Sequence, residues 1–234
     1  VKVKINGNEI DATEDQTILE ACEENDIYVP TLCNYVGLSE VGACRMCLVE
    51  VDGERLETAC TTSVEDGMEI ETDTEELWNH RRTILELIFS EENHYCMYCE
   101  MEGDCELEEM FRRAGMTNVR FPSSFQKDEV DNSNQYITID HNRCILCGRC
   151  IRACREKVSN DTLDFGNRGR ETKIIADNDV PLDASSCVSC GACVQACPTG
   201  SIYESHSSYR GTKEDCDFTQ STCVECSIGC GTEV

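Results

Sequence analysis

The cysteines of this chain stand in short groups with regular spacing, which makes them candidates for metal chemistry. Cys accounts for 20 of the 234 residues. Two runs share the pattern Cys-x2-Cys-x2-Cys-x3-Cys; they comprise Cys144, Cys147, Cys150 and Cys154, then Cys187, Cys190, Cys193 and Cys197. A tight loop with this spacing directs three thiolates at one point. Because a cubane cluster needs four ligands, the fourth thiolate of each site must come from elsewhere.

This spacing is typical of bacterial two-cluster ferredoxins, in which the fourth Cys of each run ligates the cluster of the other run. We therefore predict two [4Fe–4S] clusters with crossed ligands. The first, the Cys144 site, comprises Cys144, Cys147, Cys150 and Cys197; the second, the Cys187 site, comprises Cys154, Cys187, Cys190 and Cys193. Gly148 and Gly191 follow the second Cys of each run, where a side chain is expected to crowd the cluster. Paired zinc sites, the alternative, favour two separated Cys-x2-Cys hooks.

The group nearest the N-terminus has a wider spacing. It comprises Cys33, Cys44, Cys47 and Cys60, here called the Cys33 site. Four thiols in a strand-rich segment, with Gly42 just before the central pair, favour a [2Fe–2S] cluster. The spacing differs from the plant-type ferredoxin pattern, and a zinc ribbon is the alternative.

A third group offers three thiols and a nearby imidazole. It comprises His94, Cys96, Cys99 and Cys105, here called the His94 site. Three Cys leave one corner of a cubane without a ligand, and imidazole replaces thiolate in Rieske centres, where it raises the reduction potential. His94 is therefore the predicted fourth ligand. His80 is the competitor, but it stands in a predicted helix beside Arg81 and Arg82, a context typical of a surface residue.

The last group comprises Cys216, Cys223, Cys226 and Cys230, here called the Cys216 site. Its thiols could bind a further all-cysteine cubane or a zinc ion. Because the other cysteine groups of the chain are interpreted as iron–sulfur sites, the cubane is favoured. Only Cys22 remains outside these groups. Its place on the apolar face of a predicted helix makes it an ordinary buried thiol.

The segments around these groups predict an α+β chain. Residues 1–72 combine alternating apolar positions with the turn signals Asn6-Gly7 and Asp52-Gly53, which predict strands and hairpins. One helix begins after Thr17, because Glu20 completes a capping box with it.

The rest of the chain alternates helical and loop-rich segments. Apolar residues recur at helical spacing over 74–90, after the capping candidates Asp73 and Thr74. Residues 121–135 are polar and are predicted to be a linker, and residues 155–186 form a loop-rich insertion.

The charge balance is strongly acidic. Asp and Glu number 46 against 20 Lys and Arg, a formal net charge of −26. Such a chain repels phosphate backbones and anionic lipid, so we expect no nucleic-acid partner. No apolar run approaches the ~18–20 residues needed for membrane insertion, and no signal-peptide pattern begins the chain. Cytoplasmic metal ligation therefore explains the thiols better than disulfides do.

These motifs, in this order, resemble the iron–sulfur module shared by the 75 kDa-type subunit of respiratory complex I, NAD-linked formate dehydrogenases, and the diaphorase-side subunits of NAD-reducing or electron-bifurcating hydrogenases. The resemblance covers nearly the whole chain. It implies a β-grasp 2Fe–2S ferredoxin domain at 1–73, a His-plus-three-Cys 4Fe–4S domain at 74–120, a two-4Fe–4S ferredoxin domain at 136–205, and a four-cysteine segment at 206–234. The implied cofactors are one [2Fe–2S] cluster and three to four [4Fe–4S] clusters.

Two segments bear on the details of this resemblance. The usual family spacing, His-x3-Cys, would place a ligand at Glu92, whereas His94-Tyr95-Cys96 is similar to the small diaphorase-linked subunits of soluble NAD-reducing hydrogenases. Residues 221–231 resemble the first cluster motif of molybdenum or tungsten formate dehydrogenases, and Cys216 is the candidate for its missing ligand.

The resemblance implies an electron-transfer subunit between a flavin-containing NAD(P)H-binding subunit and a catalytic hydrogenase or formate dehydrogenase subunit, with ferredoxin as a further candidate partner in a bifurcating complex. The sequence contains no nucleophile–base pair, dinucleotide fingerprint or P-loop, so we expect a non-catalytic subunit of an NAD(P)-linked oxidoreductase. One alternative is the N-terminal module of a larger catalytic formate dehydrogenase or hydrogenase chain. Another is a zinc-binding interaction protein, which would be colourless rather than brown.

Overall fold

A mixed five-stranded sheet forms the N-terminal part of the protein, seen in a computed structural model that describes residues 1–125, 128–211, 216–224 and 231–233. Its strands are β1 (Lys2–Ile5), β2 (Asn8–Asp11), β3 (Leu48–Val51), β4 (Arg55–Thr58) and β5 (Glu69–Glu71). They lie in the order β2-β1-β5-β3-β4, with β1 and β5 parallel and the other neighbours antiparallel. This is the arrangement expected of a β-grasp domain.

Both predicted hairpins form at their turn signals. Asn6 and Gly7 have φ values of 48° and 80°, and Asp52 and Gly53 have 54° and 70°. Two successive positive φ values fit the type I′ turn, whose twist matches that of the flanking strands. The sheet's central strand, β5, was not predicted, because a three-residue strand with one buried side chain, Ile70, leaves little pattern.

Helix α1 (Ile18–Glu24) crosses this sheet and begins at the predicted capping box. The Thr17 side chain accepts a hydrogen bond from the Glu20 amide at 3.2 Å, and the Glu20 carboxylate accepts one from the Thr17 amide at 2.7 Å. Cys22 on this helix is fully buried in the apolar core, and burial raises the pKa of its thiol to about 12. The prediction of an ordinary buried thiol fits this environment.

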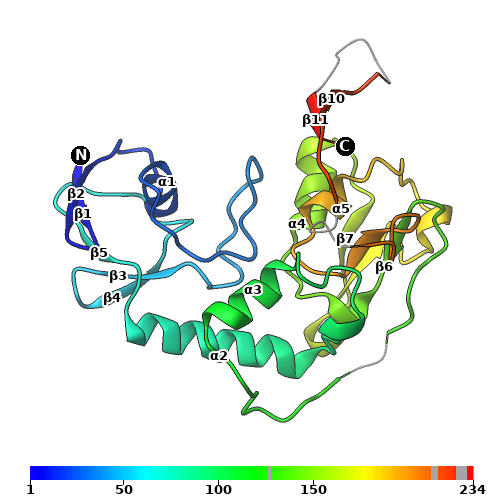
Figure 1. Ribbon diagram of the computed structural model, residues 1–234, viewed down its shortest axis with the longest axis horizontal. Coiled ribbons are helices and arrows are strands. Elements are labelled where there is room, and N and C mark those ends of the chain that lie inside the picture. The colour runs from blue at the N-terminus through cyan, green and yellow to red at the C-terminus, as the bar shows by residue number, and fades with distance from the viewer. Residues whose placement is uncertain (126–127, 212–215, 225–230, 234) are drawn as a thin grey trace.

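Helix α2 (Glu75–Glu91) leads from the N-terminal sheet to the C-terminal half of the molecule (Figure 1). Thr74 is its N-cap and accepts a hydrogen bond from the Leu77 amide at 3.2 Å. Helix α3 (Glu106–Arg113) packs beside α2. The core between these helices and the preceding cysteine loop is built from Leu32, Met46, Leu85, Leu107 and Met110.

The C-terminal half repeats one small unit twice, a cysteine loop followed by a short helix. The helices are α4 (Arg149–Arg152), which a π-helical turn at Ala153–Lys157 extends, and α5 (Ala192–Ala196). The strands β6 (Ile137–Ile139) and β9 (Ile202–Glu204) pair antiparallel and close the unit. The two helices lie against each other.

The insertion predicted to be loop-rich contains a hairpin instead. Strands β7 (Leu163–Gly166) and β8 (Lys173–Ala176) pair antiparallel. Leu163, Ile174 and Ala176 are buried against the C-terminal core, and this tertiary packing selects strand structure in segments too short to show a clear pattern.

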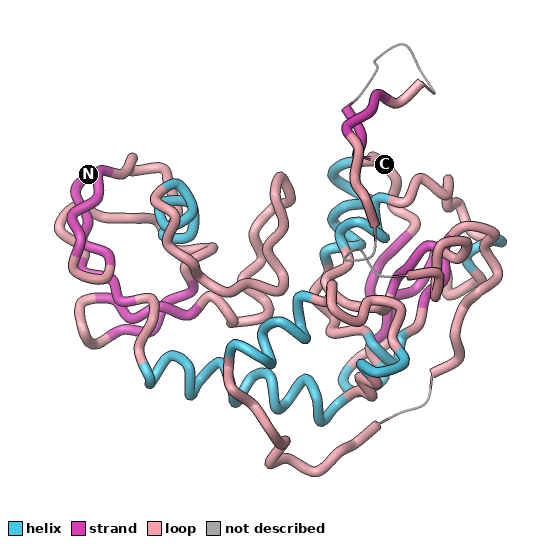
Figure 2. Tube along the Cα trace, in the orientation of Figure 1, coloured by secondary structure: helices cyan, strands magenta, loops and turns pink. Residues whose placement is uncertain are grey.

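Figure 2 shows two lobes joined by helix and loop, with a short hairpin of β10 (Gln220–Thr222) and β11 (Gly231–Glu233) near the C-terminus. The described residues of the predicted linker, 121–125 and 128–135, contain no helix and only an isolated bridge from Asp131 to Ile139. Within the described ranges, no helix has the length and apolarity to cross a bilayer.

Candidate metal centres

The four thiols of the Cys33 site lie together beside the N-terminal sheet. The Cys47 thiol donates a hydrogen bond to the Cys60 sulfur at 3.4 Å. A second pair forms between Cys33 and Cys44, whose hydrogen bond lowers the pKa of Cys33 to about 5 and, together with burial, raises that of Cys44. Sulfur atoms from two loops and two strand ends thus converge in a buried space.

Arg81 supports the loop that carries two of these thiols. Its guanidinium donates hydrogen bonds to the carbonyl oxygens of Met46 at 3.2 Å, Leu48 at 2.8 Å and Thr72 at 2.9 Å. The residue is only 1% exposed, and this burial lowers its pKa. Arg81 is therefore buried although its neighbour His80 is not, because α2 directs this position at the cysteine loop.

His80, the neighbour of Arg81, does lie on the outer side of α2. Its side chain is 43% exposed and stands 3.9 Å from the Glu76 carboxylate. His80, the competing candidate ligand, does not line the cavity that the three thiols share.

The imidazole of His94 and the thiols of Cys96, Cys99 and Cys105 line one cavity. His94 stacks edge-on against Phe89, with ring centroids 5.1 Å apart. Its Nε2 atom is buried and has no hydrogen-bond partner among the described residues. Burial, reinforced by the charge of Arg143, lowers the pKa of His94 to about 4. The ring is therefore neutral at pH 7, the form that binds metals.

Glu92, the position to which the family spacing points, is half-buried at the end of α2 and does not line this cavity. Its Oε2 atom also has no partner among the described residues, and burial raises the pKa of the carboxyl group to about 7. The geometry therefore favours His94 over Glu92 as the donor nearest the three thiols.

The two ferredoxin-like runs exchange their fourth cysteines in space. Cys197 lines the cavity of the Cys144 site, and Cys154 lines the cavity of the Cys187 site. Each cavity thus contains the crossed set of four thiols predicted from the sequence. Burial raises the pKa of Cys144, Cys147 and Cys193 to about 12, so without bound metal these groups are thiols.

Both loops have the same backbone geometry. The Leu146 amide donates to the Cys144 sulfur, and the Ser189 amide to the Cys187 sulfur, each at 3.4 Å. Gly148 and Gly191 begin α4 and α5 with φ values of 70° and 77°. The left-handed backbone favours a residue without a Cβ atom at both positions, and a Cβ atom at Gly148 would also lie 3.3 Å from the Phe165 ring.

The Cys216 site lies only partly in the described chain. Cys216 is exposed and Cys223 is half-buried, whereas Cys226 and Cys230 lie outside the described residues.

The donor sets fit iron–sulfur clusters. Thiolates are the ligands of such clusters, and imidazole is a known substitute. The unpartnered Nε2 of His94 is an orphaned buried atom of the kind that a metal would satisfy. The residues that sequence reasoning missed are the buried arginines at the sites, because a guanidinium carries no spacing signal of its own.

Comparison with known proteins agrees with this layout. The 2Fe-2S iron-sulfur cluster binding domain matches residues 1–75, the NADH-ubiquinone oxidoreductase-G iron-sulfur binding region residues 81–120, and the 4Fe-4S dicluster domain residues 143–201. The chain therefore binds 2Fe–2S and 4Fe–4S clusters.

Relatives contain this layout in chains of different length. The γ subunit of the NAD-reducing hydrogenase HoxS of Cupriavidus necator is 33% identical over 77% of this chain and 77% of its own. The α subunit of the NADPH-Fe(3+) oxidoreductase of Geobacter sulfurreducens is 34% identical over this whole chain, which spans 27% of that protein. For the HndD subunit of the NADP-reducing hydrogenase of Solidesulfovibrio fructosivorans the identity is 34%, over 86% of this chain and 36% of its own.

A solved structure agrees in three dimensions. A chain of an NAD+-reducing [NiFe]-hydrogenase in the H2-reduced state superposes with a TM-score of 0.85 at 30% identity, over 90% of this chain and 89% of its own. The chain shares these domains, and its match to the hydrogenase γ subunit covers most of both proteins. It therefore belongs to the family of iron–sulfur electron-transfer subunits of multi-subunit oxidoreductases.

Proposed function

We propose that this chain conducts electrons between a flavin-containing NAD(P)H-binding subunit and a catalytic hydrogenase subunit. The observation that supports this most is the collection of its thiols into separate cavities, each lined by the donors that one cluster needs. Bound clusters would supply one-electron chemistry, while the chain holds, spaces and tunes them. Relatives named as subunits of NAD-reducing and NADP-reducing hydrogenases favour hydrogenase over formate dehydrogenase as the partner. Ferredoxin is a further candidate partner.

The ligand sets in this proposal are those predicted from the sequence. The Cys33 site would hold the [2Fe–2S] cluster, and the His94, Cys144 and Cys187 sites would each hold a [4Fe–4S] cluster. The Cys216 site would add another cubane. The proposed domains span residues 1–73, 74–120, 136–205 and 206–234.

Contacts between the sites support a continuous path. The Arg152 guanidinium donates to the carbonyl oxygens of Cys33 at 2.5 Å and Cys147 at 3.4 Å, which joins the Cys33 and Cys144 sites. Thr199 lines the cavities of both the Cys144 and the His94 sites. The Cys144 site therefore has a neighbouring site on each side. The Cys187 site adjoins it through the exchanged cysteines.

A second candidate is a module of a larger catalytic chain. It is favoured by the relatives in which this sequence corresponds to 27% or 36% of a longer protein. The mass of the native polypeptide, read from a denaturing gel of the isolated complex, separates the two.

Metal analysis tests the proposal. We expect about 18 iron atoms per chain if every site is filled, together with a brown colour and reducible EPR signals. Iron near 14 with about one zinc would make the Cys216 site a zinc site. Iron near zero would contradict the proposal as a whole.

A further inference from the structure

The segment that follows Cys197 lies between two of the proposed cluster sites. The Cys197 thiol belongs to the Cys144 site, and two residues later Thr199 lines both that cavity and the cavity of the His94 site. From the opposite side, the Glu106 amide at the start of α3 donates to the Pro198 carbonyl oxygen at 3.0 Å. The two sites are therefore separated by this one strip of backbone.

Gly200 is the point of closest approach within this strip. A Cβ atom at this position would lie 2.3 Å from the Cys99 sulfur, far inside van der Waals contact. The backbone of Gly200 is outside the left-handed region that favours glycine, so local conformation does not require a glycine here. The requirement comes from the neighbouring sulfur, because only a residue without a side chain lets the backbone pass at this distance.

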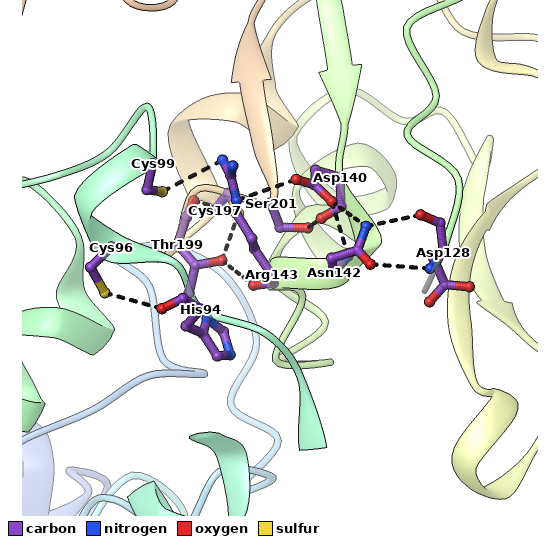
Figure 3. A network of polar contacts seen from close by, with 10 residues as sticks. All are labelled: His94, Cys96, Cys99, Asp128, Asp140, Asn142, Arg143, Cys197, Thr199 and Ser201. Carbon is purple, nitrogen blue, oxygen red and sulfur yellow. Dashed lines mark hydrogen bonds and ion pairs between the residues drawn. The ribbon is translucent and has the colours of Figure 1, made fainter. Parts of the chain in front are cut away.

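Arg143 reaches the same sulfur from the other direction. Its Nη1 atom donates a hydrogen bond to the Cys99 sulfur at 3.6 Å (Figure 3). Its Nε atom pairs with the Asp140 carboxylate at 3.2 Å, and only 14% of the Arg143 side chain is exposed. The charge of the guanidinium is therefore held beside the thiol and is weakly screened by solvent.

Thr199 connects this arginine to the other site. Its hydroxyl donates to the Arg143 carbonyl oxygen at 2.9 Å, and its own carbonyl oxygen accepts a hydrogen bond from the Cys197 thiol at 3.2 Å. Thr199 thus links Arg143, beside a thiol of the His94 site, to the strip of backbone that follows Cys197; a Cys197 thiolate bound to a cluster would have no proton to donate to this carbonyl. Figure 3 shows Arg143 next to Cys99, with Thr199 close to the arginine.

We propose that Arg143 and Gly200 are positioning residues of this junction: Gly200 lets the two sites approach, and Arg143 raises the reduction potential of the cluster at the His94 site. The inference rests on the proposed electron-transfer function. A cluster gains negative charge when it is reduced, so a nearby cation and a hydrogen bond to a ligand sulfur both stabilise the reduced form. Neither residue contributes a ligand atom.

The test of Arg143 is an EPR-monitored redox titration of the full chain with its clusters bound. Arg143→Met should shift the midpoint of the His94-site signal to lower potential and leave the other midpoints in place. Arg143→Gln, which keeps a neutral donor, should show a smaller shift in the same direction. The His94-site signal is identified as the one that Cys96→Ser removes.

Arg55→Met is the matched control. Arg55 also pairs with an aspartate three residues before it, Asp52, at 2.9 Å, but it lies 54% exposed at the β3–β4 hairpin. It should change no midpoint. If Arg143→Met loses iron, the redox titration of Arg143→Gln decides whether Arg143 raises the potential of the His94-site cluster. An unchanged His94-site midpoint in a variant that retains its clusters overturns the role of Arg143, as does an equal shift at every site.

Gly200→Ala tests the close approach. We expect loss of about 4 of about 18 iron atoms, or a shifted His94-site signal, because the new methyl group displaces Cys99. Signals from the Cys33 and Cys187 sites should persist, which excludes a failure to fold. Full iron content with an unaltered His94-site signal overturns the role of Gly200. Absence of iron from the unmodified protein would contradict the proposed function itself, so the two failures are distinct.

Discussion

At the scale of single residues, His94 is the most informative side chain of the proposed sites. Its Nε2 atom is buried and has no partner among the described residues, and burial holds the pKa of the ring at about 4. A buried polar atom without a partner costs about 1–3 kcal/mol. The three thiols that share its cavity make a bound metal the natural partner for this atom.

His94→Cys should keep a cubane at the His94 site but lower its reduction potential. A thiolate adds negative charge where a neutral imidazole stood, which disfavours the reduced form, as the higher potentials of His-ligated Rieske centres illustrate. The measurement is the midpoint of the His94-site signal in a redox titration. His80→Cys is the control and should leave that midpoint unchanged, since His80 is exposed on the far side of α2. If His94→Cys also leaves potential and spectrum unaltered, the fourth ligand is another group, with Glu92 next to test.

At the scale of elements, each of the two cysteine runs contributes its fourth cysteine to the cavity of the other run. Cys154 lies in the π-helical extension of α4 and lines the cavity of the other run, and Cys197 ends α5 and does the reverse. The antiparallel pair of β6 and β9 holds the two loops together.

Cys154→Ser should therefore damage the cluster of the Cys187 site, 33 or more residues away in sequence, and spare the Cys144 site. A serine oxygen is a harder, poorer ligand for this iron than a thiolate. Iron content should fall from about 18 to about 14 per chain, with loss of one cubane signal. Ser substitution at Cys197 is the reciprocal control and should remove the Cys144-site signal instead. Loss of the Cys144-site signal in Cys154→Ser would mean that the ligands do not cross.

The elements also show which features of the fold can be predicted from the sequence. Turns at Asn6-Gly7 and Asp52-Gly53, the capping box at Thr17 and the start of α2 after Thr74 were all predicted, because each has a local chemical signal. The hairpin of β7 and β8 was not, since its few buried residues become apparent only against the C-terminal core. For the sites, the spacing predicted which thiols share a cavity, but it held no information on the guanidinium groups beside them.

At the scale of the whole molecule, buried arginines stand out in a chain with a net charge of −26. Arg81, Arg149 and Arg152 are 1%, 2% and 7% exposed. Arg149 forms a two-pronged ion pair with Glu106 at 2.6 and 2.8 Å, which ties α4 to α3. Thiolate clusters are anionic, so the buried arginines beside the Cys33 and Cys144 sites offset charge that would otherwise accumulate inside the protein.

Arg152→Met should weaken the attachment of the N-terminal sheet domain to the C-terminal half. The guanidinium joins the two through the carbonyl oxygens of Ser39, Cys33 and Cys147, and a methionine would leave these acceptors without their donor. A lost buried partner costs about 1–3 kcal/mol. We expect unfolding in denaturant to split into two transitions, one reported by visible circular dichroism of the [2Fe–2S] cluster and one by the 4Fe–4S absorption, where the unmodified protein shows one.

Arg155→Met provides the comparison, because Arg155 lies three residues further along the same helical stretch. Its side chain is 51% exposed and pairs with Asp161 on the surface. Exposed ion pairs contribute little to stability, so this variant should unfold like the unmodified protein. Coincident transitions in Arg152→Met, at an unchanged midpoint, would show that the two halves are held together by other contacts. The Glu106–Arg149 pair would then be the next to remove, since it links α3 and α4 and its guanidinium lies over the Tyr35 ring of the Cys33 loop, 5.4 Å from the centroid.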